Sequence, residues 1–374
     1  MRVAKPSNAP NFQQLAFARG RVALAALLKA IGVRSGDEVV TQAFTCVAVP
    51  EAIMVAGAHP VYVDVSAGGV TMSAEDLALK IGQRTRAVVL QHTFGIPADI
   101  GAIFEVTSRC GVPVIEDCCH TLLSEYDGRC VGTFGLGAFY SFEWGKPVTV
   151  GLGGALRING HPEVDRTLLA MYETFSRPSF SRTARLELQY LAFRVAYHPA
   201  LYWPMRRLYT TLAATGMAET NYHGTSSIDI AAPEFSQTIT RPCGRRLRHA
   251  GRLASLHRQH SMAVAARFRE GISGATHIMV PQTASAVYAR YPLFVNGRDQ
   301  LLKTAENAGI ELAGWYRTPV HPLPENALSK ARYELGSCPA AEAAARRIVS
   351  LPTHRKTSTQ FVDKAIDFIN ANCH

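Results

Sequence analysis

The chain has 374 residues, of which 47% are hydrophobic and 18% charged, so it can bury a substantial core and is not intrinsically disordered. At about 150 residues per domain it should form two or three folding units, or one large domain with a smaller one attached. It contains no repeat, no low-complexity tract and no apolar stretch of about 18 residues, which excludes solenoids, coiled coils and membrane-spanning helices.

The 8 cysteines are not spaced as in a disulfide framework or a zinc site, because no two of them form a CxxC pair. We therefore expect reduced, mostly buried thiols and no metal site. Residues 1–10 contain no apolar run of the kind that a signal peptide needs. Together these features predict a cytoplasmic location.

The net charge of +10 is unevenly distributed. Residues 171–270 contain 14 arginines, no lysine and 6 acidic residues, an excess of 8 positive charges. No nucleic-acid-binding motif accompanies this excess, so we expect no nucleic-acid partner. Three explanations stay open: a solvated arginine-rich helical face, a membrane-surface contact, or an anionic small substrate.

The first 160 residues alternate amphipathic helix patterns with short apolar strands. We expect helices at 22–31, 47–55, 73–81 and around 100–104, and strands at 38–41, 60–65, 87–90, 113–117 and 138–142. Continuous apolar strands between helices indicate a sheet that is buried on both faces and mainly parallel. Ligands of such α/β sheets bind at the carboxyl ends of the strands, so the residues that follow each strand are the candidates for chemistry.

From residue 171 the pattern becomes helical, and it returns to α+β near the C-terminus. We expect a helical stretch at 184–212 broken by Pro199 and Pro204, a loop at 227–242, a basic helix at 247–268, a strand at 288–295 and a helix at 299–308. Thr357 and Gln360 are spaced as a capping box before a last helix. The chain therefore divides into a large domain (1–271) with a helical insert at about 171–240, and a smaller α+β domain (272–374).

The insert combines aromatic and basic residues in an unusual way. Six aromatic residues lie among three arginines within 184–214: Tyr190, Phe193, Tyr197, Tyr202, Trp203 and Tyr209, with Arg194, Arg206 and Arg207. This composition predicts a segment that covers an active-site entrance or makes a peripheral membrane contact. The alternative is that the aromatic side chains pack internally or against a second subunit.

Three features at strand ends could carry chemistry. Asp117 ends an apolar strand, where it could meet a ligand nitrogen or serve only as a satisfied strand-end carboxylate. Lys146 follows the strand 138–142 beside a glycine-rich turn, where burial could free its amine for a Schiff base; the alternative is a surface ammonium. Gly20 and Arg21 open the first helix, whose free N–H groups would suit a phosphate.

In this order the features resemble the DegT/DnrJ/EryC1/StrS family of sugar aminotransferases, which have the fold-type I architecture and use pyridoxal 5′-phosphate (PLP). The resemblance covers nearly the whole chain except the middle, in the segments 36–39, 44–45, 58–61, 63–65, 84–87, 95–99, 131–135, 315–321 and 338–352. It implies a large domain with a mainly parallel sheet and a smaller C-terminal α+β domain.

The resemblance also implies roles for single residues. Lys146 stands five residues after Ser141, as the family's Schiff-base lysine stands after its phosphate-binding serine. Asp117 takes the place of the acid that pairs with the pyridinium nitrogen and keeps the ring protonated. His120 occupies the position that approaches the cofactor ring. Gly20 and Arg21 stand where the family's Gly-Thr holds the phosphate.

At three positions the sequence departs from the family. Arg21 replaces a threonine, so that a hydroxyl contact with the phosphate would become an ion pair. Cys46 falls at the cofactor-binding position where the family has an aromatic residue stacked on the ring, so His120 or Phe44 would cover that face instead. The asparagine that the family brings to the phosphate from a neighbouring subunit has no clear counterpart, and Ser236 is the nearest.

The resemblance implies a homodimeric PLP-dependent aminotransferase. Its amino donor would be an amino acid, glutamate by resemblance, and its acceptor a keto sugar linked to a nucleotide. Dehydratases of the family replace the Schiff-base lysine with histidine, so Lys146 argues against that branch. The alternative is a membrane-surface-associated or non-catalytic member that keeps the fold and binds PLP without transamination, an idea that Cys46 and the insert suggest.

Overall fold

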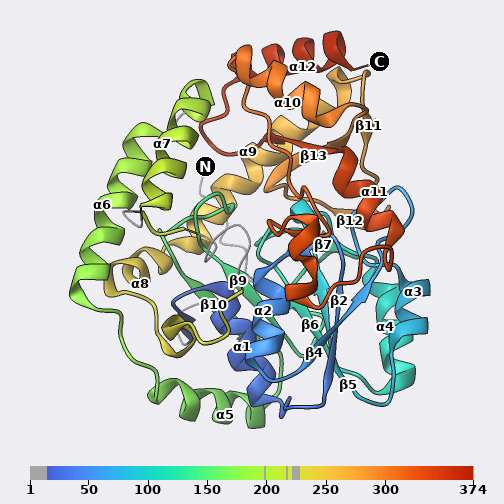
Figure 1. The fold of residues 1–374 in the computed structure, drawn as a ribbon, viewed down its shortest axis with the longest axis vertical. Helices are drawn as coiled ribbons and strands as arrows, with labels where there is room; N and C mark the ends of the chain where they lie inside the picture. Colours follow the sequence, from blue (N-terminus) through green and yellow to red (C-terminus); the bar gives the residue numbers. More distant parts are fainter. Residues whose placement is uncertain (1–14, 198, 216–217, 221–227, 374) are drawn as a thin grey trace.

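The computed structural model describes residues 15–197, 199–215, 218–220 and 228–373 (Figure 1). Its largest sheet has seven strands in the order β1-β10-β9-β6-β5-β2-β4. Their bounds are β1 Ala16–Phe17, β2 Glu38–Gln42, β4 His59–Val63, β5 Thr85–Gln91, β6 Val114–Asp117, β9 Gly137–Ser141 and β10 Gly154–Ile158.

The five strands from β9 to β4 are parallel, which confirms the predicted mainly parallel α/β sheet. The edge differs from the prediction. Strand β10 pairs antiparallel with β9, and β1 pairs antiparallel with β10. The glycine-rich residues before β10 indicated only a turn, because a sequence pattern does not show which strand a following segment will pair with.

Helices cover both faces of this sheet, as its buried strands require. One face packs against α1 (Gly20–Ala30), α2 (Ala48–Val55) and α5 (Pro162–Glu173). The other packs against α3 (Ala74–Lys80), α4 (Ile100–Cys110) and the first residues of α9 (Ala250–Gly271). Helix α1 is apolar on nearly all sides, because it lies between the sheet and the helices α2 and α5.

The predicted insert forms two long helices, α6 (Phe180–Ala196) and α7 (Tyr202–Ala214). The chain breaks between them at η2 (Pro199–Leu201), close to the predicted break at Pro199. Pro204 does not break α7, because it stands in the first turn, where its missing N–H is not needed. In Figure 1 the two helices run along the left edge, between α5 at the bottom and the C-terminal elements at the top.

The last part of the insert, where a loop was predicted at 227–242, contains more regular structure than expected. It contains η3 (Pro233–Ser236), and α8 (Arg241–Leu247) begins inside the predicted range. Residue 227 lies outside the described residues. The long basic helix α9 follows as a separate helix, three residues later than its predicted start.

The C-terminal part builds a small antiparallel sheet from β11 (Thr276–His277), β13 (Arg290–Phe294) and β15 (Ile348–Pro352). Its helices are α10 (Arg298–Asn307), α11 (Pro339–Arg347) and α12 (Thr359–Asn372), with η4 at Glu325–Ala331. Ser358, not Thr357, caps α12, because its hydroxyl accepts the Phe361 N–H. The capping box was therefore predicted one residue too early. The boundary at residue 272 stays a prediction.

Two minor sheets join segments that are far apart in sequence. Strand β3 (Thr45–Cys46) pairs in parallel with β14 (Val320–His321), which brings the chain around Cys46 beside the C-terminal segment 315–321. Strands β7 (Glu125–Tyr126), β8 (Arg129–Cys130) and β12 (Ala284–Ser285) form the other, and η1 (Thr93–Gly95) follows β5. All 8 cysteines are free thiols, as predicted. Among the described residues, every helix is too short or too polar to cross a bilayer.

Candidate active site

One cavity at the carboxyl ends of β6 and β9 brings together the residues that the sequence predicted for the site, except the two substitutes suggested for missing family residues, Phe44 and Ser236. The residues brought together are Gly20, Arg21, Cys46, Asp117, His120, Ser141 and Lys146. Asp117 and Ser141 are the last residues of β6 and β9, and Gly20 is the first residue of α1. The walls also include residues to which the sequence assigned no role: Ala48, Val49, Cys119, Phe139, Glu143, Trp315 and Tyr316.

Asp117 is a buried carboxylate held in a fixed orientation. Its Oδ1 accepts the backbone N–H of Cys119 at 2.9 Å. Burial raises the pKa of Asp117, and the contacts with Cys119 and the charge of Lys146 oppose that shift. A buried carboxylate of this kind gains most from a ligand that brings a positive charge or an N–H group to it.

Lys146 lies half-buried in the turn that follows β9. Its backbone N–H donates to the Glu143 carbonyl at 3.2 Å, and Gly145 before it has a φ of 78°, a conformation that favours glycine. The ammonium is close enough to lower the pKa values of Asp117 and His120 electrostatically. The turn therefore points the amine into the same cavity as the acid.

His120 is neutral and makes two hydrogen bonds. Burial, and then the charge of Lys146, lower its pKa well below the ordinary value. Its Nδ1 accepts the Phe94 N–H at 3.1 Å, so its Nε2 carries the proton and donates to the Tyr316 hydroxyl at 3.2 Å. Its ring lies within 9° of parallel to that of Trp315, with the centroids 6.0 Å apart.

The N-terminus of α1 closes the cavity beside Ser141. A Cβ atom on Gly20 would lie 3.1 Å from the Ser141 Cβ, so glycine lets the helix approach the end of β9. Arg19 stands at the N-cap but provides no side-chain cap to α1, and Gly20 and Arg21 line the cavity. An uncapped helix start beside a serine hydroxyl is suited to an anion.

The side chain of Arg21 has a protein partner. Its guanidinium is ion-paired with Glu51 of α2, and both side chains are buried. Glu51 also accepts the Asp229 N–H at 3.1 Å. The predicted ion pair between Arg21 and a phosphate would therefore share the arginine with Glu51, and it stays a prediction.

Cys46 lines the cavity from β3, and its Sγ accepts the Ala48 N–H at 3.5 Å. Burial raises the pKa of its thiol. Phe44, one of the two residues suggested to replace the missing aromatic, is fully buried behind the cavity against Phe94 and Tyr316. His120 and Trp315 supply the aromatic rings of the cavity wall instead. Trp315 stands in a segment that carried the family resemblance, but no signal in the sequence placed it beside residue 120.

Ser236 does not line this cavity within one chain. It lies exposed in η3, and its hydroxyl donates to the Pro233 carbonyl at 3.1 Å. Its suggested role concerns a neighbouring subunit, so it stays a prediction.

Three buried residues at and beside β6 have the side-chain types of a metal site: His92, Glu116 and Cys118. The Glu116 carboxylate already has hydrogen-bond partners at both oxygens. Glu116 accepts the N–H groups of Gly132, Phe134 and Gly135 at 2.6–2.9 Å and faces His92 Nε2 at 3.2 Å. Glu116 therefore anchors the loop 131–135 to β6 and in this way supports the adjacent Asp117.

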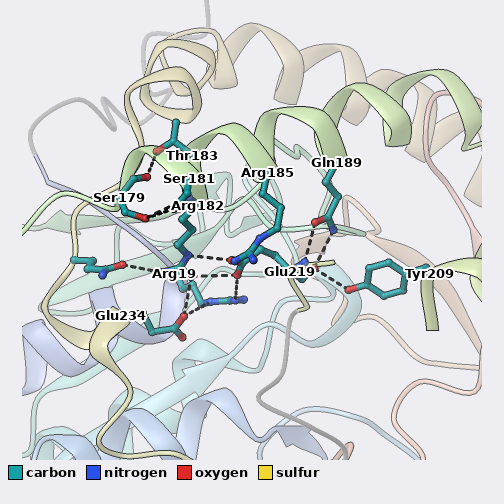
Figure 2. Close-up of polar contacts among 11 residues, drawn as sticks. Arg19, Ser179, Ser181, Arg182, Thr183, Arg185, Gln189, Tyr209, Glu219 and Glu234 are labelled. Atoms are coloured by element: carbon teal, nitrogen blue, oxygen red, sulfur yellow. Dashed lines mark hydrogen bonds and ion pairs between the residues drawn. The ribbon is translucent and has the colours of Figure 1, made fainter. Parts of the chain in front are cut away.

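A buried ionic network ties the insert to the start of α1 (Figure 2). Arg19 donates to Glu234 at 2.7 Å and lies 3.7 Å from both Glu143 and Glu219. Arg182 of α6 contacts Glu219 and Glu234, and Arg185 of α6 reaches Glu219 at 2.6 Å. Because Glu143 lines the cavity, the network connects the insert to the turn that carries Lys146.

The six aromatic side chains of 184–214 are buried or half-buried, whereas Phe180 at the start of α6 is 88% exposed. Tyr190 and Phe193 pack on Trp144, which lies in the turn between Ser141 and Lys146. The Trp203 Nε1–H donates to the Ile310 carbonyl at 2.8 Å. The outer face of α6 instead carries the aliphatic residues Leu188, Leu191 and Val195, which are 71%, 57% and 87% exposed. The structure therefore supports internal packing of the aromatic residues, and the membrane contact stays a prediction.

Comparison with known proteins gives a consistent result. The model of the DegT/DnrJ/EryC1/StrS aminotransferase family matches residues 12–195 and 245–370. The UDP-N-acetyl-3-dehydro-α-D-glucosamine 3-aminotransferase of Acidithiobacillus ferrooxidans is 25% identical over 363 residues, 96% of this chain and 83% of that protein. The GDP-perosamine synthase of Escherichia coli O157:H7 is 38% identical over 149 residues, 40% of this chain and 41% of that protein.

Among solved structures, the fold is similar to that of DesV from S. venezuelae, determined in complex with a ketimine intermediate. The TM-score is 0.72 at 24% identity, and the alignment covers 96% of this chain and 84% of DesV. This similarity supports the fold-type I architecture predicted from the sequence.

Proposed function

The chain belongs to the DegT/DnrJ/EryC1/StrS aminotransferase family, and from that premise we propose that it uses PLP to transfer an amino group from an amino acid to a keto sugar. One observation carries the proposal: Lys146, Asp117, Ser141 and the N-terminus of α1 line a single cavity. When bound, PLP would supply an aldehyde that takes up the amino group and a ring that accepts electrons from the α-carbon of the donor.

The residues of the cavity fit this cofactor. Asp117 offers a buried carboxylate for the ring nitrogen, and Lys146 offers an amine for the aldehyde. The Ser141 hydroxyl and the uncapped start of α1 suit the phosphate. His120 and Trp315 offer ring faces in place of the aromatic residue that the family has at the position of Cys46.

Each residue would then have a defined task in the reaction. Asp117 keeps a proton on the ring nitrogen, because a carboxylate beside it stabilises the charged form. The Lys146 amine moves a proton away from the α-carbon of the donor, since it is the one lysine amine among the described residues that line the cavity. His120, held neutral by burial, orients its Nε2–H toward Tyr316 and keeps the wall of the cavity rigid.

The substrates follow from the family and its members. The proposed donor is glutamate, and the proposed acceptor is a nucleotide-linked keto sugar, the class that the name of the Acidithiobacillus relative describes. The arginine excess of the insert suits the diphosphate of such an acceptor.

An absorbance experiment tests the proposal. The PLP-loaded protein should change to the pyridoxamine phosphate spectrum when glutamate is added, and a suitable nucleotide keto sugar should reverse the change. If glutamate, glutamine and alanine all leave the spectrum unchanged, the protein is the non-catalytic PLP-binding member that Cys46 suggested, and the proposal is wrong.

We also propose that the protein works as a homodimer in which the neighbouring subunit completes the phosphate site. The support is the family resemblance, together with a phosphate site for which the described residues of one chain offer Ser141, the start of α1 and an arginine shared with Glu51. Light scattering measures the mass of the active species. A strictly monomeric protein with full transaminase activity would contradict the proposal.

A further inference from the structure

A second cavity lies between the insert and the C-terminal part of the chain, and we call it the α7/α10 groove. It has a volume of about 670 Å³, within the range of small-molecule sites. Its walls are five residues of α7, five of α10 and one of the loop before β14: Trp203, Arg206, Arg207, Thr210, Thr211, Arg298, Asp299, Leu302, Lys303, Glu306 and Arg317.

The groove has an excess of positive charge. Five of its side chains are cationic and two are acidic. Both acids are already paired, Glu306 with Arg207 and Asp299 with Arg298. Among the described residues, no carboxylate lies within ion-pair distance of the three other cations, Arg206, Lys303 and Arg317.

These cations are close enough to repel one another. The pKa of Arg317 is lowered by partial burial and then by the charges of Arg206 and Arg298, a shift that the charge of Asp299 only partly opposes. The Arg206 guanidinium lies 5.3 Å from the Trp203 ring centroid, and the Trp203 side chain is held by its bond to Ile310. A converging set of guanidinium groups without carboxylate partners favours a multivalent anion, because arginine binds phosphate oxygens with two parallel N–H groups.

One short segment of the chain contributes residues to both the groove and the candidate active site. Trp315 and Tyr316 line the active-site cavity, and Arg317, the next residue, lines the groove. Trp315 and Arg317 are therefore separated by at most about 7 Å of extended chain. The α7 wall belongs to the part of the chain that the family model does not match, between residues 195 and 245. One wall of the groove is thus supplied by this chain's insert, and the other by residues that the family model matches.

We propose that the α7/α10 groove binds the diphosphate of the nucleotide-linked acceptor and holds the sugar toward the active-site cavity, with Arg206 and Arg317 as the principal ligands. This inference rests on the proposed function, since it assigns the substrate's anionic part to a particular place. A nucleoside diphosphate carries the charge that the unpaired cations need, and the groove has room for it.

Binding of UDP and of inorganic pyrophosphate to the PLP-loaded protein tests the inference directly. Arg206→Gln and Arg317→Gln should each weaken binding of both probes about 10-fold, as expected for the loss of one charge-assisted hydrogen bond. Arg109→Gln is the matched control, because Arg109 is an exposed arginine on α4, outside the groove, and should leave binding unchanged. Thermal unfolding of each variant shows that it is folded.

Two further measurements separate the possible failures. If UDP and pyrophosphate bind both groove variants as tightly as the wild type, the groove is not the diphosphate site. If the variants instead lose binding to vesicles of anionic lipid, the insert contacts a membrane and the inference is overturned. The response of the wild-type protein to glutamate is recorded alongside, because its absence would refute the proposed aminotransferase reaction and would leave the binding result to stand on its own.

Discussion

Asp117 and Glu116 are neighbours in β6, but their carboxylates have different environments. Glu116 is surrounded by three backbone N–H groups and His92, and these bonds lower its pKa even though burial alone would raise it. Asp117 has one backbone partner, and burial raises its pKa. Because alternate residues of a strand face opposite sides, the Glu116 carboxylate points into the core and the Asp117 carboxylate into the candidate site.

Asp117→Asn should bind PLP and lose activity. The amide has almost the same shape but no charge, so it cannot keep the ring nitrogen protonated. We expect the rate of the glutamate reaction to fall by at least about 100-fold, the scale of a lost acid–base partner. Single-turnover absorbance measures that rate. Asp127→Asn, at an exposed turn, is the control, and equal rates in the two variants would contradict the role of Asp117.

Glu116→Gln should destabilise the fold. The substitution replaces a carboxylate oxygen with an NH₂ group that faces backbone donors in a buried place, which costs about 2 kcal/mol or more of the free energy of unfolding. Urea unfolding measures the loss, and Glu105→Gln on the exposed face of α4 is the comparison. A variant as stable as the wild type would show that the loop 131–135 does not depend on this carboxylate.

At the scale of elements, the first helix of the insert, α6, is anchored at both ends. Its start is held by the network around Arg19, and its C-terminal end by the Tyr197 hydroxyl, which donates to Glu311 at 3.0 Å. Lys356 also donates to the Tyr197 carbonyl at 2.6 Å. The insert therefore spans from the start of α1 to the C-terminal sheet and packs on the turn of Lys146 between them.

Glu219→Gln should weaken this anchor. Arg19, Arg182 and Arg185 would keep their charges but lose one of their carboxylate partners, and breaking a buried ionic contact costs about 3 kcal/mol. The midpoint of urea unfolding should fall accordingly. Asp363→Asn removes an exposed ion pair with Arg267 and should cost less than about 1 kcal/mol. Similar losses in both variants would show that the network is no stronger than a surface pair.

The sequence predicted the parallel strands and the residues at their ends, because apolar runs, helix periodicity and a single lysine after a strand are local signals. It did not predict that β10 and β1 extend the sheet antiparallel, since pairing partners are set by contacts distant in sequence. For the ring face it suggested His120 or Phe44; His120 lines the cavity and Phe44 does not, and Trp315, which was not suggested, lines it as well. The pairing of β3 with β14 brings residues near 46 and 315 together. The sequence patterns around these two segments do not show that they pair.

For the molecule as a whole, the arginines of the basic segment 171–270 have more than one structural role. Arg182, Arg185 and Arg246 hold the insert to the body of the protein through Glu219 and Glu187. Arg206 lies exposed in the α7/α10 groove. The basic segment is therefore not a uniformly solvated arginine face, and Arg206, which has no carboxylate within ion-pair distance among the described residues, borders the groove proposed for the substrate.

Stability should fall as the pH drops from 6.5 to 5. Burial lowers the pKa of His257 to about 4, that of His321 to about 3 and that of His120 well below its ordinary value. In the unfolded chain each titrates near 6.5, so the unfolded state binds more protons below that pH and acid favours unfolding. Each histidine should remove roughly 1.6 kcal/mol over this interval, about 5 kcal/mol for the three.

Urea unfolding at several pH values measures this slope. His257→Gln keeps a donor for the Tyr288 carbonyl but removes one titrating group, so its slope between pH 6.5 and 5 should be shallower by about one third. A free energy of unfolding that does not change over this interval would show that these histidines are accessible to protons in the folded protein.

The measurement that bears most directly on the account is the position at which PLP becomes attached to the chain. The protein is incubated with PLP, reduced with borohydride and digested, and its peptides are mapped by mass. Among the described residues, Lys146 is the one lysine in the wall of the cavity with Asp117 and Ser141, so the phosphopyridoxyl group should be found on Lys146 and should be missing from Lys146→Ala. A label on any other lysine, such as Lys80 at the end of α3, would contradict the assignment of the site.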